Sequence, residues 1–178
     1  MRVTISGPPG SGKTTVCKLL AERLGSDYII SGSVFRSMAQ RLDLSLAEFG
    51  QLARRDPKYD QMIDEDMVRQ AMEREDVVLE GRLAAYNLAR RGIPAFKVYL
   101  DAPPRVRAVR IVEREHGDVE RALEEMLERE ECEAERYRSW YGIDLKDMSV
   151  YDLVVDTSDL LPEEVVDLIV CGMGGRDG

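Results

Sequence analysis

Short apolar runs recur along the chain, each followed by a longer stretch with helix-like composition. The runs are rich in β-branched side chains, as buried strands are. We expect strands at Val3–Ser6, Tyr28–Ser31, Val77–Glu80, Phe96–Asp101 and Tyr151–Asp156. Strands that alternate with helices are typical of a parallel sheet covered on both faces. The pattern therefore predicts an α/β fold, in which a five-stranded parallel sheet is sandwiched between helices.

The stretches between these runs predict the covering helices. We expect helices at Thr14–Leu24, Val34–Arg41, Ser45–Arg54, Lys58–Glu75, Leu83–Arg91, Pro104–Glu115, Val119–Tyr141 and Pro162–Cys171. The last helix has clear boundaries, because Pro162 suits a first turn and Gly172 is expected to end it. We expect the tail, residues 172–178, to be frayed. No linker or repeat interrupts the pattern, so residues 1–178 are expected to form a single domain.

The clearest chemical signal is the run Gly7–Thr14, which reads Gly-Pro-Pro-Gly-Ser-Gly-Lys-Thr. It is a complete GxxxxGK[ST] phosphate-binding loop between a predicted strand and a predicted helix. Glycines reach backbone angles closed to other residues, so successive N–H groups can turn inward around a phosphate, and the helix start adds further donors. We expect a nucleoside triphosphate to bind at Gly7, Pro8, Pro9, Gly10, Ser11, Gly12, Lys13, Thr14 and Thr15. Lys13 should reach the β- and γ-phosphates, and the Thr14 hydroxyl should hold Mg²⁺.

Two arginines stand just beyond the ends of predicted strands. Arg36 closes the run 31–36 (Ser-Gly-Ser-Val-Phe-Arg), and Arg82 follows Glu80-Gly81 after the third strand. Ligands of parallel sheets bind at the carboxyl ends of the strands, and arginine captures a phosphate or carboxylate with paired hydrogen bonds. We therefore expect an anionic acceptor beside the triphosphate, although each arginine could instead pair with a local acid. Glu80 is expected to orient Mg²⁺ through water, the alternative being a helix cap.

A row of arginines follows the fourth predicted strand. Arg107, Arg110 and Arg114 fall on one face of a helix at about 100° per residue. The opposite face, expected to meet the core, holds Ala108, Val109 and Val112. An arginine face is ordinarily solvated, but at this place it fits a mobile lid that neutralises the transferring phosphoryl group and excludes water. We expect catalytic roles for Arg110 and Arg114, and Arg107 could belong either to the lid or to the solvated surface.

A second charged row lies on the following predicted helix. Arg129, Glu133 and Arg136 share one face of it. They could be simple i,i+4 ion pairs, each contributing a few tenths of a kcal/mol. They could also be two phosphate-binding cations on either side of an acid that hydrogen-bonds a base or a sugar. The spacing alone does not decide between the two.

Composition narrows the class of protein. No apolar run approaches the roughly 20 residues of a membrane span, and the net charge of −9 disfavours a nucleic-acid surface, which needs a basic face. Cys17, Cys132 and Cys171 lack paired or metal-ligand spacing, and the chain opens on a predicted strand rather than a leader. We therefore expect reduced thiols and a cytoplasmic location. His116, the only histidine, adjoins Gly117 and is expected to lie in an exposed turn.

Taken together, these motifs resemble a known family, the short archaeal type of cytidylate kinase among the P-loop nucleoside monophosphate kinases. The resemblance is carried by Gly7–Thr15, the run 31–36, Glu80-Gly81-Arg82 and Tyr137–Ser158. It extends from residue 1 to about residue 169. The phosphate-binding loop is shared by many families. More diagnostic are the Ser-Gly-x-x-[Phe/Tyr]-Arg run, the Gly-Arg after the third strand, and Glu135-Arg136-Tyr137 leading into Tyr141-Gly142-Ile143-Asp144.

The resemblance implies a P-loop kinase fold with a helical lid. The acceptor-binding region would cover about residues 33–75 and the lid about residues 105–141. The implied reaction is Mg²⁺-dependent transfer of the ATP γ-phosphate to CMP or dCMP. Ser31 would contact the cytosine region, Arg36 and Arg82 would hold the CMP phosphate, and Arg129 would belong to the lid side. The expected acceptor site comprises Ser31, Phe35, Arg36, Arg82, Glu133 and Arg136, and the expected catalytic cations are Lys13, Arg110, Arg114 and Arg129.

Two departures from the family pattern bear on base specificity. The chain is shorter than the bacterial enzymes and lacks their inserted substrate domain, and Leu83 replaces the aspartate that usually follows Gly-Arg. One alternative is another small-acceptor kinase such as an adenylate kinase, whose usual Asp-Gly-Phe-Pro-Arg run is missing. The others are an ATP-binding switch without an acceptor and, against the acidic balance, a polynucleotide 5′-kinase. We expect a monomer that acts on small nucleotides, with no nucleic-acid or membrane partner.

Overall fold

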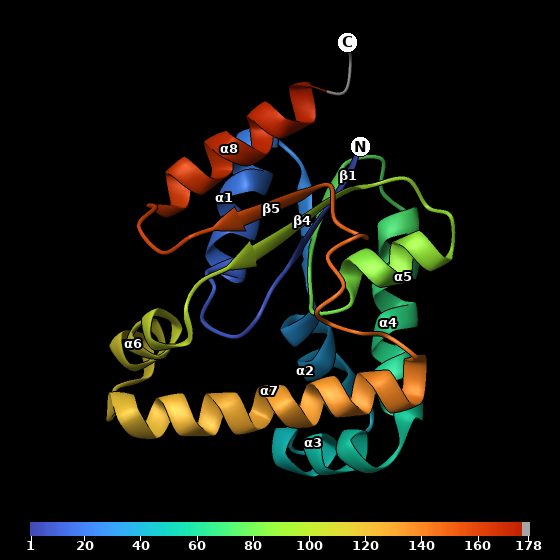
Figure 1. Cartoon of the computed structure of the whole chain (residues 1–178). Helices are drawn as coiled ribbons and strands as arrows, with labels where there is room; N and C mark the ends of the chain where they lie inside the picture. Colours follow the sequence, from blue (N-terminus) through green and yellow to red (C-terminus); the bar gives the residue numbers. More distant parts are fainter. Residues whose placement is uncertain (176–178) are drawn as a thin grey trace.

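The computed structural model describes residues 1–175, which fold around a five-stranded sheet (Figure 1). Its strands are β1 (Arg2–Ser6), β2 (Asp27–Ile30), β3 (Val77–Glu80), β4 (Phe96–Asp101) and β5 (Leu153–Asp156). The strand order is β2-β3-β1-β4-β5, and all neighbouring strands are parallel. The predicted sheet is confirmed. Four boundaries differ, three of them by one residue: β1 begins at Arg2, β2 begins at Asp27, and Ser31 opens a helix instead of ending β2. The strand β5 begins at Leu153 rather than Tyr151.

Helices connect successive strands, as the sequence predicts. They are α1 (Lys13–Leu24), α2 (Ser31–Arg41), α3 (Leu46–Arg55), α4 (Pro57–Met72), α5 (Ala84–Arg90), α6 (Pro104–Glu115), α7 (Val119–Tyr141) and α8 (Pro162–Gly174). The prediction that Gly172 ends the last helix is wrong, since α8 continues to Gly174. A Cβ at Gly172 would lie 3.3 Å from Phe96 Cζ, so this glycine lets α8 approach β4 closely. Of the tail expected to fray, residues 176–178 lie outside the described residues.

The sheet is covered by helices on both faces (Figure 1). On one face, α1 and α8 pack over the centre of the sheet, with Ile5, Leu20, Val98 and Ile169 fully buried between them. On the other face, a second core joins β2 and β3 to α2, α3, α4 and α5. Strands buried on both sides need apolar residues throughout, which explains the continuous apolar runs in the sequence. None of the helices within residues 1–175 has the length and apolarity of a membrane span.

The carboxyl ends of the strands face a separate group of helices. In Figure 1 the long helix α7 runs across this edge of the sheet, with α2 and α3 beside it and α6 at one end. The loop after β1, the start of α2 after β2, and the segment after β3 therefore open toward α7. These are the places where the sequence puts its candidate chemistry.

Helix α3, which belongs to this group, begins with a capping box. The Ser45 hydroxyl accepts a hydrogen bond from the Glu48 backbone N–H at 3.2 Å, and the Glu48 carboxylate accepts one from the Ser45 N–H at 2.9 Å. We expect Ser45→Ala to lower the free energy of unfolding by about 1 kcal/mol, because an N-terminal N–H of α3 loses its partner. Urea denaturation measures this loss. Ser37→Ala, at an exposed position within α2, is the matched control; an equal loss there would contradict the capping explanation.

Candidate active site

The phosphate-binding loop forms a tight turn between β1 and α1. Gly10 and Gly12 take positive φ angles of 78° and 89°, where side chains are strained. A Cβ at Gly10 would lie 2.6 Å from the Arg107 carbonyl oxygen, so the loop closes onto α6 only with glycine there. Helix α1 starts at Lys13 without a side-chain cap, which leaves its first N–H groups available to an anion. The predicted loop thus has the backbone geometry that a phosphate needs.

Lys13, Thr14 and Glu80 gather beside this loop. The Lys13 ammonium donates to the Pro8 carbonyl at 2.7 Å, and burial lowers its pKa from 10.5 to about 8 against the attraction of Glu80. Glu80 ends β3 with 6% of its surface exposed, and burial raises its pKa, opposed by Lys13 and by a hydrogen bond from the Thr14 hydroxyl. One hydroxyl and one buried carboxylate fit Mg²⁺, which takes few protein oxygens and completes its shell with water and phosphate.

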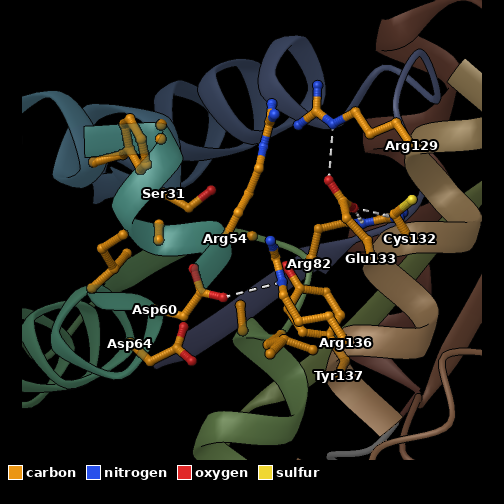
Figure 2. A pocket seen from close by; sticks show the side chains of 18 of the residues that line it. Ser31, Arg54, Asp60, Asp64, Arg82, Arg129, Cys132, Glu133, Arg136 and Tyr137 are labelled. Carbon is orange, nitrogen blue, oxygen red and sulfur yellow. Dashed lines mark hydrogen bonds and ion pairs between the residues drawn. The ribbon is translucent and has the colours of Figure 1, made fainter. Parts of the chain in front are cut away.

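A cavity of about 860 Å³ lies between α7 and the helices that follow β2 (Figure 2). The structure brings seven of the predicted site residues together around it: Ser31, Phe35, Arg36, Arg82, Arg129, Glu133 and Arg136. They come from α2, from the segment after β3, and from α7. The cavity is therefore built from three distant parts of the chain, at the carboxyl edge where the sequence predicts the acceptor.

Glu133 connects the two sides of this cavity. Its carboxylate accepts a hydrogen bond from Arg82 Nε at 2.9 Å and one from Arg129 Nε at 2.9 Å (Figure 2). Burial works to raise the pKa of Glu133, but the two guanidinium groups offset it, and the net direction is downward. Arg82 also donates to the Gly7 carbonyl at 3.3 Å. The charged row of α7 is thus more than a set of local helix pairs, because its Glu133 also binds Arg82, which contacts the phosphate-binding loop.

Arg36 is the second arginine predicted at a strand end. Its guanidinium donates to the Ser33 hydroxyl at 3.0 Å, and no acid within residues 1–175 forms an ion pair with it. The side chain lines the cavity and is exposed there. The alternative that Arg36 pairs with a local acid is therefore not what the structure contains.

The predicted arginine face of α6 is wrong in two respects. Arg107 is 4% exposed, whereas Val109, expected in the core, is 38% exposed. Arg107 donates to the Ala102 carbonyl at 2.8 Å and the Pro9 carbonyl at 3.1 Å, and it pairs with Glu130 of α7 at 2.5 Å. It ties α6 to the phosphate-binding loop and to α7, so the surface interpretation is wrong, and a lid role for Arg107 stays a prediction.

The other two arginines of α6 also lie away from the cavity. Arg110 donates to Thr157 Oγ1 at 3.0 Å beyond the end of β5, and Arg114 is exposed and pairs with Glu115. Neither lines the cavity, so their catalytic roles remain predictions. His116 is exposed at the end of α6 with a φ of 61°, which confirms its turn position. The cysteines form no disulfide, also as expected.

The structure adds cavity residues that the sequence did not single out. Arg54 extends from α3 toward Arg129, and Asp60 and Asp64 reach the cavity from α4, where Asp60 lies 3.4 Å from Arg136 (Figure 2). The two aspartates stand at i and i+4, next to the buried positions of their helix. A polar pair at the edge of an apolar stripe is the one signal that could have pointed to them.

Comparisons with known proteins agree with this architecture. The sequence profile of the cytidylate kinase-like family matches residues 2–159. A protein from Halobacterium salinarum named cytidylate kinase is 45% identical over 170 residues, covering 96% of this chain and 88% of its own. One of the same name from Sulfolobus acidocaldarius is 38% identical over 170 residues, covering 96% and 92%.

Solved structures confirm the predicted P-loop kinase fold. Shikimate kinase from Bacteroides thetaiotaomicron superposes with a TM-score of 0.64 at 16% identity, covering 99% of this chain and 97% of its own. At that identity the likeness shows the fold alone. The profile match and the identities above show more: the chain belongs to the cytidylate kinase-like family.

Proposed function

We propose that this protein is a cytidylate kinase, which transfers the γ-phosphate of ATP to CMP or dCMP with Mg²⁺. One observation carries the proposal beyond family membership. Arg82 reaches from the cavity to the phosphate-binding loop, bonding Glu133 on one side and the Gly7 carbonyl on the other. A phosphate held by Arg82 in the cavity would therefore lie beside the loop that receives the triphosphate.

The residues present can supply positioning and charge, which is most of what phosphoryl transfer needs. The loop N–H groups and Lys13 would bind the triphosphate, and Arg36 and Arg82 would bind the acceptor phosphate. Arg129, which is 70% exposed in its side chain, is free to move toward a transferring phosphoryl group. The acceptor phosphate is itself a nucleophile, so the reaction needs no general base from the protein.

Thr14 and Glu80 are the residues that would hold Mg²⁺. Their oxygens lie together at the start of α1 and the end of β3, and Glu80 is well placed to act through a water molecule. When bound, the ion neutralises charge on the β- and γ-phosphates.

A coupled assay of ADP release with MgATP and each nucleoside monophosphate in turn tests the proposal. We expect strong preference for CMP and dCMP. Equal turnover of AMP would favour the adenylate kinase alternative. Release that does not depend on any acceptor would favour an ATP-binding switch, as would failure of CMP to bind when ATP is absent.

The lowered pKa of Lys13 predicts how activity depends on pH. In the free protein the ammonium loses its proton as the pH rises through about 8, whereas bound phosphates favour the charged form. We therefore expect kcat/KM for MgATP to fall as the pH rises past this value, while kcat at saturating MgATP falls less. Lys13→Arg should remove this decline, because arginine stays protonated; a decline that persists in the variant would assign it to another group.

We also propose that the enzyme acts as a monomer in the cytoplasm on free nucleotides. The net charge of −9 disfavours binding to nucleic acid. Size-exclusion chromatography with light scattering tests the oligomeric state.

A further inference from the structure

One corner of the cavity holds polar side chains that the phosphate chemistry does not use. We call it the α4–α7 corner: Asp60 and Asp64 of α4 with Arg136 and Tyr137 of α7, all of which line the cavity. Tyr141, one turn further along α7, does not line the cavity, but the charges of both aspartates act on it. In Figure 2 the two aspartates lie across from Arg136 and Tyr137, while Arg54 and Arg129 lie at the opposite side of the view.

The corner adjoins the phosphate end of the cavity, because Arg136 stands about one turn after Glu133 on α7. The charges that act most strongly on Lys13 are Glu80, Arg82, Glu133 and Arg129. The charge that acts most strongly on Asp60 is Arg136. Arg82 and the corner line one cavity, so a nucleotide whose phosphate lies at Arg82 has room to place its base at the α4–α7 corner.

Hydrogen bonding in this corner is incomplete. Asp60 Oδ2, Arg136 Nε and Tyr141 Oη are buried and have no hydrogen-bond partner within residues 1–175, although such groups are nearly always paired. Asp60 and Arg136 approach to 3.4 Å as an ion pair, and their side chains keep 16% and 20% exposure. Oδ2 and Nε themselves are buried and face each other, so a ligand in the cavity would meet the exposed remainder of the two side chains.

The carboxylate of Asp60 can accept further hydrogen bonds, whereas that of Asp64 is already engaged. Asp64 accepts a hydrogen bond from the side chain of Asn87. Asp60 has only the ion pair with Arg136, and a guanidinium carries five N–H donors, more than the described contacts of Arg136 use. The corner thus presents an acceptor directly beside a donor.

This order of acceptor and donor is complementary to the hydrogen-bonding edge of cytosine and not to that of uracil. Cytosine carries an amino donor at C4 beside the acceptor N3, whereas uracil carries a carbonyl acceptor at C4 beside the donor N3–H. Against Asp60 and Arg136, uracil would place oxygen against carboxylate and N–H against guanidinium. Adenine has the same order as cytosine, so the pair separates amino bases from oxo bases, not pyrimidines from purines.

We propose that Asp60 and Arg136 read the base, the Asp60 carboxylate accepting from the 4-amino group of cytosine and the Arg136 guanidinium donating to N3. The inference deepens the proposed function and rests on it. It assigns base discrimination to residues of α4 and α7. Asp60 would supply the carboxylate that is missing at Leu83, the position after Gly-Arg.

The variant Asp60→Asn tests this assignment, because its amide keeps the size of the side chain and can donate to a carbonyl at C4. We measure kcat/KM for CMP and for UMP. The expected result is a fall of about 10- to 100-fold in the CMP-to-UMP ratio. Glu65→Gln removes a charge from an exposed position of the same helix outside the cavity, and its ratio should match that of the unaltered protein.

A second measurement does not depend on how the variant folds. The unaltered protein is given a CMP analogue with hydrogen in place of the 4-amino group. We expect kcat/KM to fall by a similar factor relative to CMP.

The possible results distinguish failure of the base-reading pair from failure of the proposed function. If the unaltered protein prefers CMP, but Asp60→Asn melts normally and keeps the CMP-to-UMP ratio, the base-reading pair is wrong and the proposed function stands. Equal use of CMP and the analogue with hydrogen at C4 by the unaltered protein would also overturn the pair. If the unaltered protein prefers no cytosine nucleotide, both inferences fail.

Discussion

Lys13→Ala is expected to lower kcat for CMP phosphorylation by about 100- to 1000-fold, the typical loss when one fixed donor to developing charge is removed. Lys13 is the cation of the phosphate-binding loop, and the uncapped N-terminus of α1 lies directly beside it. Steady-state kinetics with MgATP and CMP measure the effect. The loop N–H groups remain, so binding of ATP should weaken less than turnover falls.

Folding is expected to survive this substitution. Burial disfavours the charged form of Lys13, as the downward direction of its pKa shows, so its removal relieves a desolvation cost that offsets the lost hydrogen bond to the Pro8 carbonyl. Lys18→Ala, at an exposed position of the same helix, is the matched control and should keep full activity. A Lys13→Ala protein that melts normally and retains kcat within a fewfold of the original would contradict the role of Lys13.

The sequence predicts the fold well because its signals are local. The central strands β1 and β3 are buried on both faces and so are largely apolar, and the loop motif fixes the turn after β1. Gly172 shows the limit of such signals. A glycine near the end of a helix usually terminates it, but here it faces Phe96 and Leu153 of the sheet, and that contact exists only in three dimensions.

The candidate site likewise contains residues that local sequence signals reveal and residues that they do not. Arg82, Glu133 and Arg136 could be found because they follow strand ends or share a helix face. Arg107 has the spacing of a solvated arginine, yet its partners come from the phosphate-binding loop and α7, which the spacing cannot reveal. Asp60 matters only because α4 places it opposite Arg136. Contacts between helices that are far apart in the sequence determine the roles of these residues, and a single sequence does not reveal such contacts.

Arg82→Ala is expected to raise the KM for CMP by about 10- to 100-fold, the range for the loss of a hydrogen-bonded charge. KM for MgATP should change much less, because the loop and Lys13 are untouched. The loss would have a second component. Glu133, whose side chain is 11% exposed, would keep only Arg129 as a neutralising partner, and its pKa should rise. Steady-state kinetics with CMP varied at saturating MgATP measure the main effect.

Two further variants separate the position of Arg82 from its charge. Arg82→Lys keeps the charge but cannot bond Glu133 and the Gly7 carbonyl with one planar group, so we expect it to recover only part of the affinity for CMP. Arg121→Ala removes an arginine that is 80% exposed on α7 and should leave both KM values unchanged. Two results would contradict this role: Arg82→Ala leaves CMP kinetics unchanged, or Arg82→Lys restores them fully. Either would mean that the acceptor is not positioned by the Arg82 guanidinium bonding both Glu133 and the Gly7 carbonyl. The acceptor phosphate would then have to be held by Arg36 and Arg129 alone.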